Sequence, residues 1–120
     1  MIGVEKFFIN GATLEIELAD NFFKRLRGLM FRRRLEARHG LLLAPCDGVH
    51  MLFMRFSIDV IYLDKDLCIK KIVRDLTPWL GLSFCLGAWA ALEFPSGEAD
   101  RLNLVVGQKF IRNAKKNSRQ

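Results

Sequence analysis

The sequence predicts a mainly β domain of the α+β class, a compact antiparallel-rich β-barrel or curled sheet with one or two short helices. Two observations support this prediction. Short alternating or apolar runs recur along the chain between turn residues, and helical spacing is confined to brief segments such as residues 21–29. A chain of 120 residues has the commonest size of a single domain. We therefore assign residues 1–112 to one domain and expect a disordered basic tail over residues 113–120.

The first element that we expect is a β-hairpin with strands over residues 4–10 and 12–18. Its turn is Asn10-Gly11, which is a strong hairpin signal between two apolar or alternating runs. Asp20 is placed to cap a helix over residues 21–29, because a carboxylate there can accept the first unpaired N–H groups. The opening of the chain is therefore predicted as strand, strand and helix.

Further strands are expected along the remaining chain, separated by turn residues such as Pro45 and Asp64-Lys-Asp66. Residues 98–102 are predicted to form a helical turn at most. The expected strands cover residues 40–45, 67–76, 88–94 and 109–112.

The central stretch, residues 46–64, predicts a second hairpin. Alternation over residues 49–54 indicates a strand with one dry face, and residues 59–64 indicate a second strand. Such a hairpin would bring His50 and Asp59 within reach of each other. It is the place in the chain where polar groups of different chemistry converge, so we expect a polar site beside it.

Composition limits the classes of function. The chain is 51% hydrophobic with 10 Phe, enough for a core, and its net charge of +6 favours anionic partners. Its 3 Cys show no CxxC spacing and no matching His pair, which argues against zinc and favours buried reduced thiols. We expect no metal and no cofactor.

Location and assembly follow from the apolar runs. The beginning of the chain has no secretory signal pattern, so we expect a cytoplasmic protein. The longest uncharged run, residues 77–92, is shorter than the ~18 residues of a membrane helix and contains proline and glycine. We therefore expect no membrane insertion, and we expect a monomer.

One catalytic interpretation joins Cys46, His50 and Asp59 as nucleophile, base and orienting carboxylate. The structural interpretation makes His50 a hydrogen-bonded strand residue and Cys46 a packed small side chain. Because nucleophilic cysteines usually lie at a helix N-terminus or beside a cation, the structural interpretation is favoured for Cys46.

Asp59 lies in an apolar run, where an unpaired charge is very costly. We therefore expect it to be buried with a defined partner, and the candidates are Arg27, Arg32 and Arg55. Asp64 is expected to cap the turn that follows it, although the two carboxylates together could instead bind a divalent cation.

Two surfaces have alternative interpretations. Positive charge is concentrated over residues 24–38 and returns in the tail, which could bind nucleic acid. No nucleic-acid motif accompanies it, so a solvated face is favoured and nucleic acid is an improbable partner. Trp79, Phe84 and Trp89 could line a binding groove or face a partner protein, but core packing is favoured.

Four blocks in order carry a resemblance to a known family: residues 27–32 (Arg-Gly-Leu-Met-Phe-Arg), 40–43, the central stretch, and 92–97 (Leu-Glu-Phe-Pro-Ser-Gly). Together they resemble the DUF192 family of small, functionally unassigned prokaryotic domains. The resemblance runs from about residue 25 to residue 110. Many members have Trp-Met-Lys-Asn-Thr where this chain has Phe-Met-Arg-Phe-Ser at residues 53–57, so a role of that Asn does not carry over.

These observations predict a binding module that takes a small anionic ligand or a protein partner at the central hairpin. The alternatives are a hydrolase or transferase that depends on Cys46 and His50, and a weak nucleic-acid-associated module. The residues expected to line the site are Arg27, Arg32, His50, Met54, Asp59 and Glu93.

Overall fold

The computed structural model describes residues 3–19, 38–51 and 53–112. In these residues strand far exceeds helix, as the sequence predicts. The helix expected over residues 21–29 and the tail over residues 113–120 lie outside the described ranges. The elements are β1 (Gly3–Ile9), β2 (Ala12–Ala19), β3 (His39–Leu43), β4 (Gly48–His50), β5 (Ile58–Leu63), β6 (Ile69–Leu76), β7 (Leu82–Phe84), β8 (Ala90–Pro95), α2 (Glu98–Arg101) and β9 (Ile111–Arg112).

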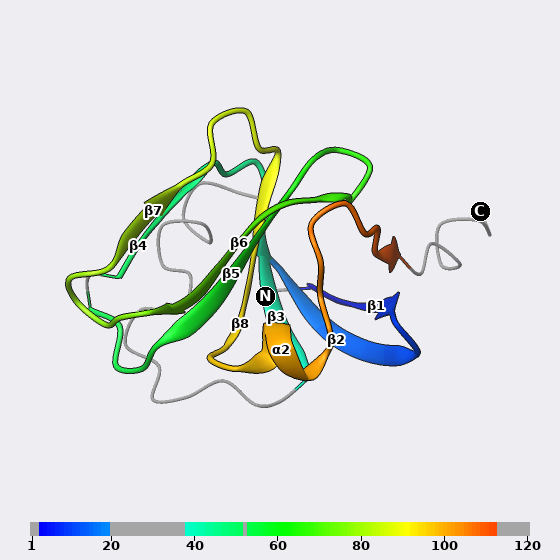
Figure 1. Ribbon diagram of the computed structural model, residues 1–120, viewed down its shortest axis with the longest axis horizontal. Helices are drawn as coiled ribbons and strands as arrows, with labels where there is room; N and C mark the ends of the chain where they lie inside the picture. Colours follow the sequence, from blue (N-terminus) through cyan, green and yellow to red (C-terminus); the bar gives the residue numbers. More distant parts are fainter. Residues whose placement is uncertain (1–2, 20–37, 52, 113–120) are drawn as a thin grey trace.

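Seven strands form one strongly curled sheet in the order β6-β5-β8-β3-β2-β1-β9 (Figure 1). Neighbouring strands are antiparallel except β2 and β3, which are parallel. The remaining strands, β4 and β7, pair with each other as a separate two-stranded sheet at one end of the molecule. The predicted curled, antiparallel-rich sheet is therefore confirmed.

The first hairpin is confirmed residue by residue. Ile9 pairs with Ala12 across the turn, and Asn10 and Gly11 have φ angles of 48° and 79°. Both central residues have positive φ, as the favoured two-residue hairpin turns with Asn-Gly require. The Asn10 side chain also donates to the carbonyls of Leu102 and Asn103, at 2.9 and 3.0 Å, so the turn is anchored to the chain that follows α2.

The predicted central hairpin is wrong. β4 pairs with β7, whereas β5 lies between β6 and β8 in the large sheet. Residue 51 leaves the strand pattern because its backbone bonds to the distant loop: its N–H donates to Gly81 (3.0 Å) and its carbonyl accepts from Trp79 (2.7 Å). Phe53 then has φ of 65°, far from the values of a regular strand. The side chains of Met51 and Met54 are buried, but they project from a loop and not from a strand.

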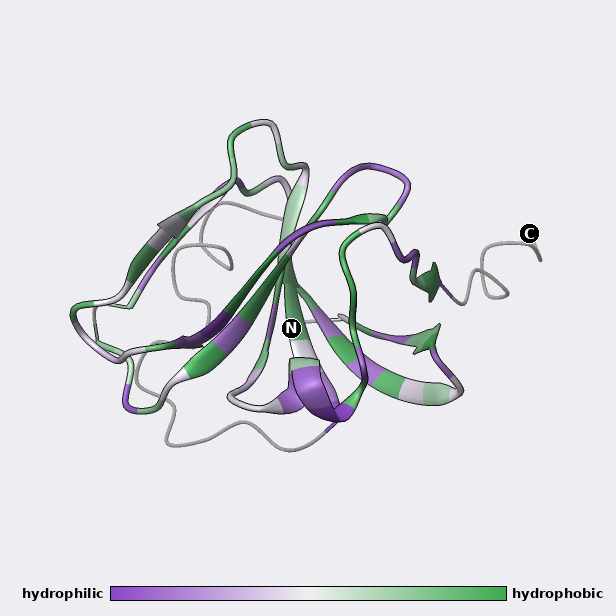
Figure 2. Ribbon diagram, in the orientation of Figure 1, coloured by the Kyte–Doolittle hydropathy of each residue, from purple (hydrophilic) through white to green (hydrophobic). Residues whose placement is uncertain are grey.

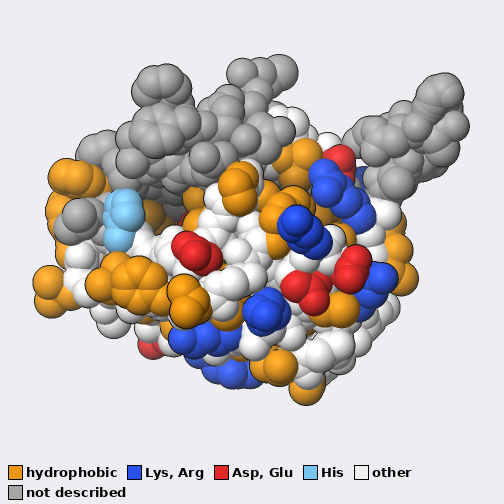
Figure 3. Space-filling view, turned by 90° about the horizontal axis from the view of Figure 1, so that it is seen from above, with side chains coloured by type: hydrophobic (Ala, Val, Ile, Leu, Met, Phe, Trp, Pro, Cys, Tyr) orange, Lys and Arg blue, Asp and Glu red, His pale blue; other side chains and the backbone are white. Residues whose placement is uncertain are grey.

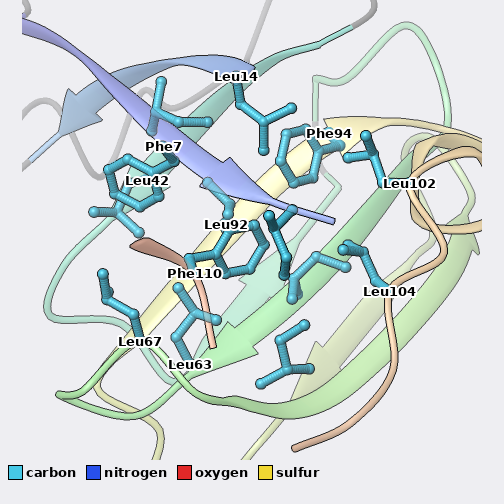
Figure 4. Packing of buried hydrophobic residues seen from close by; sticks show 14 of the residues in the cluster. Phe7, Leu14, Leu42, Leu63, Leu67, Leu92, Phe94, Leu102, Leu104 and Phe110 are labelled. Atoms are coloured by element: carbon cyan, nitrogen blue, oxygen red, sulfur yellow. The ribbon is translucent and has the colours of Figure 1, made fainter. Parts of the chain in front are cut away.

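A first core fills the concave side of the large sheet. It is formed by large side chains from both ends of the chain, including Phe7 and Phe110, whose ring centroids are 6.1 Å apart. Figure 4 shows these rings packed with Phe94, Leu102 and Leu104, the last two from the segment around α2. The strands that face this core are mostly hydrophobic in Figure 2, whereas α2 is hydrophilic. The helix therefore closes one end of the core: Glu98 and Ala99 are buried, and Asp100 and Arg101 are exposed.

A second core lies on the opposite face of β5 and β8. Successive strand residues point to opposite faces, so Ile61 and Leu63 of β5 enter the first core while Val60 and Tyr62 enter the second. All six residues of β5 are buried. The second core also takes Met51 and Met54, and the β4–β7 sheet covers part of it.

Candidate interaction surface

Asp59 is buried, with 1% of its surface exposed, and it is held by backbone groups. Its Oδ1 accepts the N–H of Asp75 (2.9 Å), and its Oδ2 accepts those of Gly97 (3.1 Å) and Ala99 (2.9 Å). The carboxylate therefore caps the start of α2 and ties it to β6, because the first N–H groups of a helix have no partner within it. Burial with a defined partner was expected, and here that partner is backbone. Arg55 is exposed, and Arg27 and Arg32 lie outside the described residues.

The other candidates among the described residues lie on the other side of the sheet. Asp59 is paired with Phe94, which belongs to the first core, whereas Met54 belongs to the second. Glu93 is buried on the second-core face, because its register partners are Leu41 and Val60 of that core. The described residues therefore bring Met54 and Glu93 to one face and place Asp59 on the opposite one.

Cys46 and His50 lie at the β4–β7 sheet, on the second-core side of the molecule. The Cys46 thiol donates to the carbonyl of Gly48 at 3.0 Å. His50 is exposed on β4, opposite Leu82 of β7. The body of the large sheet separates both from the Asp59 carboxylate, so that carboxylate cannot orient the imidazole as a catalytic relay would require.

A buried polar cluster lies beneath the β4–β7 sheet. The hydroxyls of Tyr62 and Ser83 are 2.6 Å apart, and Ser83 is the inward-facing residue of β7. Burial raises the pKa of the Tyr62 phenol to about 12, although the Ser83 hydrogen bond acts in the opposite direction; the charges of Cys46, Cys85 and Glu93 raise it further. The phenol therefore stays neutral at physiological pH.

Asp64 has the structural role expected of it. Its Oδ1 accepts the N–H groups of Asp66 (2.8 Å) and Cys68 (3.0 Å), which closes the turn between β5 and β6. Among the described residues, no group of three His, Cys, Asp or Glu side chains is placed to hold a metal ion.

The expectation of core packing is wrong for Trp79 and Phe84, which are 51% and 61% exposed. Trp89 is half-buried and packs against the first core. β7 explains the difference: its inward position is taken by the small Ser83, and its large side chains point outward. The period-two pattern Leu80, Leu82, Phe84, Leu86 was visible in the sequence, but alternation does not say which face of a strand is covered.

We give the name apolar surface to six exposed residues: Leu80, Leu82, Phe84, Leu86, Phe53 and Trp79. Leu80 and Leu86 at its ends are 90% and 92% exposed, and Leu82 is 60% exposed. The rings of Phe53 and Trp79 meet edge to face with centroids 5.2 Å apart. Figure 3 shows hydrophobic side chains gathered at the end of the molecule that carries β4 and β7.

Glycine shapes this surface at one point. Phe84 lies opposite Gly48 of β4, and a Cβ on Gly48 would come within 3.0 Å of the Phe84 ring. The absence of a side chain on Gly48 therefore leaves room for the Phe84 ring to pack against β4, so that the apolar surface extends beyond the single strand β7.

Basic side chains lie beside the apolar surface. The Lys71 ammonium donates to the carbonyl of Phe84 at 2.7 Å. Exposed His50 lies opposite Leu82 across the β4–β7 ladder, and exposed Arg55 follows Phe53 by two residues in the chain. Asp47 adds one exposed carboxylate. A partner with carboxylates around an apolar centre would match this charge distribution.

Comparison with known proteins gives relatives without an assigned activity. The UPF0127 protein PF1050 of Pyrococcus furiosus is 38% identical over 106 residues, which are 81% of this chain and 85% of that protein. A UPF0127 protein of Thermococcus sibiricus is 35% identical over 103 residues, which are 82% of this chain and 66% of that protein.

Solved structures agree on the fold. A crystal structure of a protein of unknown function from Novosphingobium aromaticivorans has a TM-score of 0.79 and 25% identity, and the match covers 91% of this chain and 84% of that one. A putative transcription regulator from Sinorhizobium meliloti has a TM-score of 0.84 at 23% identity, over 92% of this chain and 95% of that one.

Within the described residues, no helix has the length and hydrophobicity needed to cross a membrane. The DUF192 family model, described as "Uncharacterized ACR, COG1430", matches residues 5–111, and the chain therefore belongs to this family.

Proposed function

We propose that this chain is a binding module whose apolar surface docks a partner protein that carries carboxylates around an apolar segment. The observation that supports the proposal is the row of outward large side chains on and around β7, from Leu80 to Leu86. Water-exposed side chains of this kind are unfavourable unless another surface covers them.

The size of the apolar surface favours a protein over a small molecule. If each fully exposed residue has an area of roughly 200 Å², the exposed fractions of the six residues correspond to roughly 800 Å² in total. The largest apolar patch of an ordinary monomer covers roughly 300–600 Å², and one partner in a standard protein interface contributes roughly 800 Å². The surface therefore has the area that a stable protein complex needs.

Charge narrows the chemistry of the partner. The chain carries a net charge of +6, so two copies would repel each other. Lys71 bonds to the backbone of Phe84, and exposed Arg55 is two residues from Phe53 in the chain; both would attract carboxylates on the partner. An acidic partner protein thus fits better than a second copy of this chain.

The polar-site and catalytic alternatives have weaker support. A small anionic ligand would need cations beside Met54 and Glu93, but both of these side chains are buried in the second core. A Cys46–His50 enzyme would lack the orienting carboxylate, because Asp59 is committed to backbone amides on the far face. Binding through the apolar surface is therefore the proposed activity.

The test compares two double variants of the full chain. Leu80→Ser/Leu86→Ser changes the two most exposed residues of the apolar surface, and Val105→Ser/Val106→Ser changes two exposed valines elsewhere. Proteins that tagged wild type retains are identified and purified, and their affinities are measured by calorimetry. We expect the leucine variant to bind at least about tenfold more weakly, because the apolar contact that it loses is worth more than about 1.4 kcal/mol. The valine variant should bind as wild type does. Binding of wild type should weaken as the salt concentration rises.

Two results would contradict the proposal. One is equal affinity of both variants for every retained partner. The other is that wild type floats with vesicles of anionic lipid when no partner protein is present, and the leucine variant does not. That result would show that the apolar surface binds a membrane.

A further inference from the structure

Cys46 and Cys85 are neighbours across an extension of the β4–β7 ladder. Gly48 pairs with Phe84, and the N–H of Cys85 donates to the carbonyl of Asp47 at 2.9 Å, which continues the ladder by one residue. Cys46 is the next residue along. A hydrogen-bonded antiparallel pair has Cα atoms roughly 5.5 Å apart, and one further residue along the strand adds roughly 3.4 Å at right angles. The two Cα atoms are then roughly 6.5 Å apart, within the range of roughly 4.4–6.8 Å that a disulfide spans.

Adjacent ladder positions normally face opposite sides, but here both side chains contact the second core. Cys46 and Cys85 are each half-buried and pack against the second core. Both lie close enough to the Tyr62 hydroxyl for their charges to raise the pKa of that phenol. Their backbones are fixed by further bonds, from Cys46 N–H to Trp89 (2.9 Å) and from Ala88 N–H to Cys85 (3.0 Å). The ladder spacing and the shared packing against the second core therefore bring the two cysteines within the range that a disulfide spans.

We infer that Cys46 and Cys85 form a reversible dithiol–disulfide site that reacts with small-molecule disulfides. All three cysteines are thiols in the structure. A thiolate of the pair attacks one sulfur of the small disulfide, the S–S bond breaks, and a small thiol leaves with the electron pair and takes up a proton. The second cysteine thiolate then attacks the protein sulfur of the mixed disulfide and releases the other small thiol. The protein pair loses two electrons and two protons, and the small disulfide gains them.

Cys68 is a built-in control for this reaction. It is also half-buried, but it lies in the turn between β5 and β6, where its N–H is bonded to Asp64 and its bridge partner is Lys109. It belongs neither to the β4–β7 ladder nor to the second core. A link that forms by chance during unfolding would involve Cys68 as readily as the other two.

The link would join the segment before β4 to the segment after β7, next to Leu86 at one end of the apolar surface. It would restrain the two-stranded sheet without covering the outward side chains. This inference does not depend on the identity of any docking partner.

The experiment equilibrates the full chain in buffers of glutathione and glutathione disulfide, alkylates the remaining thiols, and measures intact mass and linked peptides. We expect wild type and Cys68→Ser to lose the mass of two hydrogens, to lose two alkylation sites, and to yield a Cys46–Cys85 peptide. Cys46→Ser and Cys85→Ser should instead each carry a glutathione adduct. Separate adducts on Cys46 and Cys85 in wild type, a link through Cys68, or reaction only in urea would overturn the inference. The Cys68→Ser protein keeps the test decisive if the other variants fold poorly.

Discussion

At the residue scale, Asp59 is the side chain on which the most backbone structure depends. Its carboxylate joins β5, β6 and the start of α2 through three N–H groups. Asp64 also accepts two backbone N–H groups, but it does so in an exposed turn. The two residues form a matched pair in which the chemistry is the same and the burial differs.

We expect Asp59→Ala to lower the free energy of unfolding by roughly 3–5 kcal/mol, because buried donors would lose their acceptor. Asp64→Ala should lower it by only about 1 kcal/mol, since water can replace the carboxylate there. Urea melts of both variants measure the difference. Equal and small losses would show that the N–H groups around Asp59 do not depend on it.

Tyr62 provides a pH-dependent test. It is the single Tyr of the chain, so its ionisation can be followed by ultraviolet absorbance without overlap from another tyrosine. Because burial raises its pKa from 10.0 to about 12, the folded state favours the neutral phenol. The resulting stability is fully present below pH 10 and is lost as the pH rises through about 12.

We therefore expect the folded protein to titrate near the raised pKa, and urea-unfolded protein near the ordinary value. The stability of wild type should fall more steeply than that of Tyr62→Phe above pH 10, by up to roughly 3 kcal/mol. A phenol that titrates at its ordinary pKa in the folded protein would show that the β4–β7 sheet does not exclude water from it.

At the element scale, the β4–β7 sheet depends on a close approach between two loops. A Cβ on Gly81 would lie 2.5 Å from the Thr77 carbonyl oxygen and 2.8 Å from Met51. Gly3, by contrast, has one side-chain atom within 4 Å, at 3.9 Å. We expect Gly81→Ala to destabilise the protein by roughly 1–3 kcal/mol through overpacking, and Gly3→Ala to change stability little.

Hydrogen exchange locates that effect. Amides bonded across the two loops, such as those of Met51 and Trp79, should lose protection in Gly81→Ala, while amides of the β1–β2 hairpin should keep theirs. Uniform loss of protection in the whole molecule would mean that the β4–β7 sheet is not a separate unit.

Elements set by local chemistry could be predicted from the sequence. Asn10-Gly11 fixed the first hairpin because its turn type is encoded in two residues, and the runs that became β5, β6 and β8 were marked by apolar or alternating residues. Pairing between distant segments was not encoded locally. Val49 to Met54 alternates like a strand, yet the backbone of Met51 bonds to Gly81 and Trp79, and nothing near Met51 in the sequence indicates that.

The candidate site was less predictable than the fold, for a related reason. The burial of Asp59 followed from its apolar neighbours, but its partners come from residues 75, 97 and 99. Its separation from His50 follows from strand order in the sheet. A partner-facing role for Trp79 and Phe84 was the less favoured interpretation, because the alternation of Leu82, Ser83 and Phe84 does not say which face of β7 is covered until the strand is placed beside β4.

At the scale of the whole molecule, the positive charge allows a prediction about nucleic acid. Arg74 is ion-paired with Asp100 at 2.9 Å, which offsets part of the positive charge. We expect only weak binding to a fluorescent oligonucleotide, with a log–log salt slope of about −0.7 to −0.9 per phosphate contacted, and loss of binding by physiological salt. Sub-micromolar binding that survives this salt and vanishes in Arg33→Ala/Arg34→Ala would instead make nucleic-acid binding the favoured function.

The pairing of β1 with β9 also has a consequence for the order of folding. Glu5 and Arg112, which form an ion pair across these strands, are 107 residues apart in the chain. Closing so long a loop costs entropy before any contact offsets it, so we expect this pair to form after the transition state. Arg112→Ala should then accelerate unfolding and leave the folding rate nearly unchanged in stopped-flow measurements. Slower folding of this variant would instead place the β1–β9 contact in the folding nucleus.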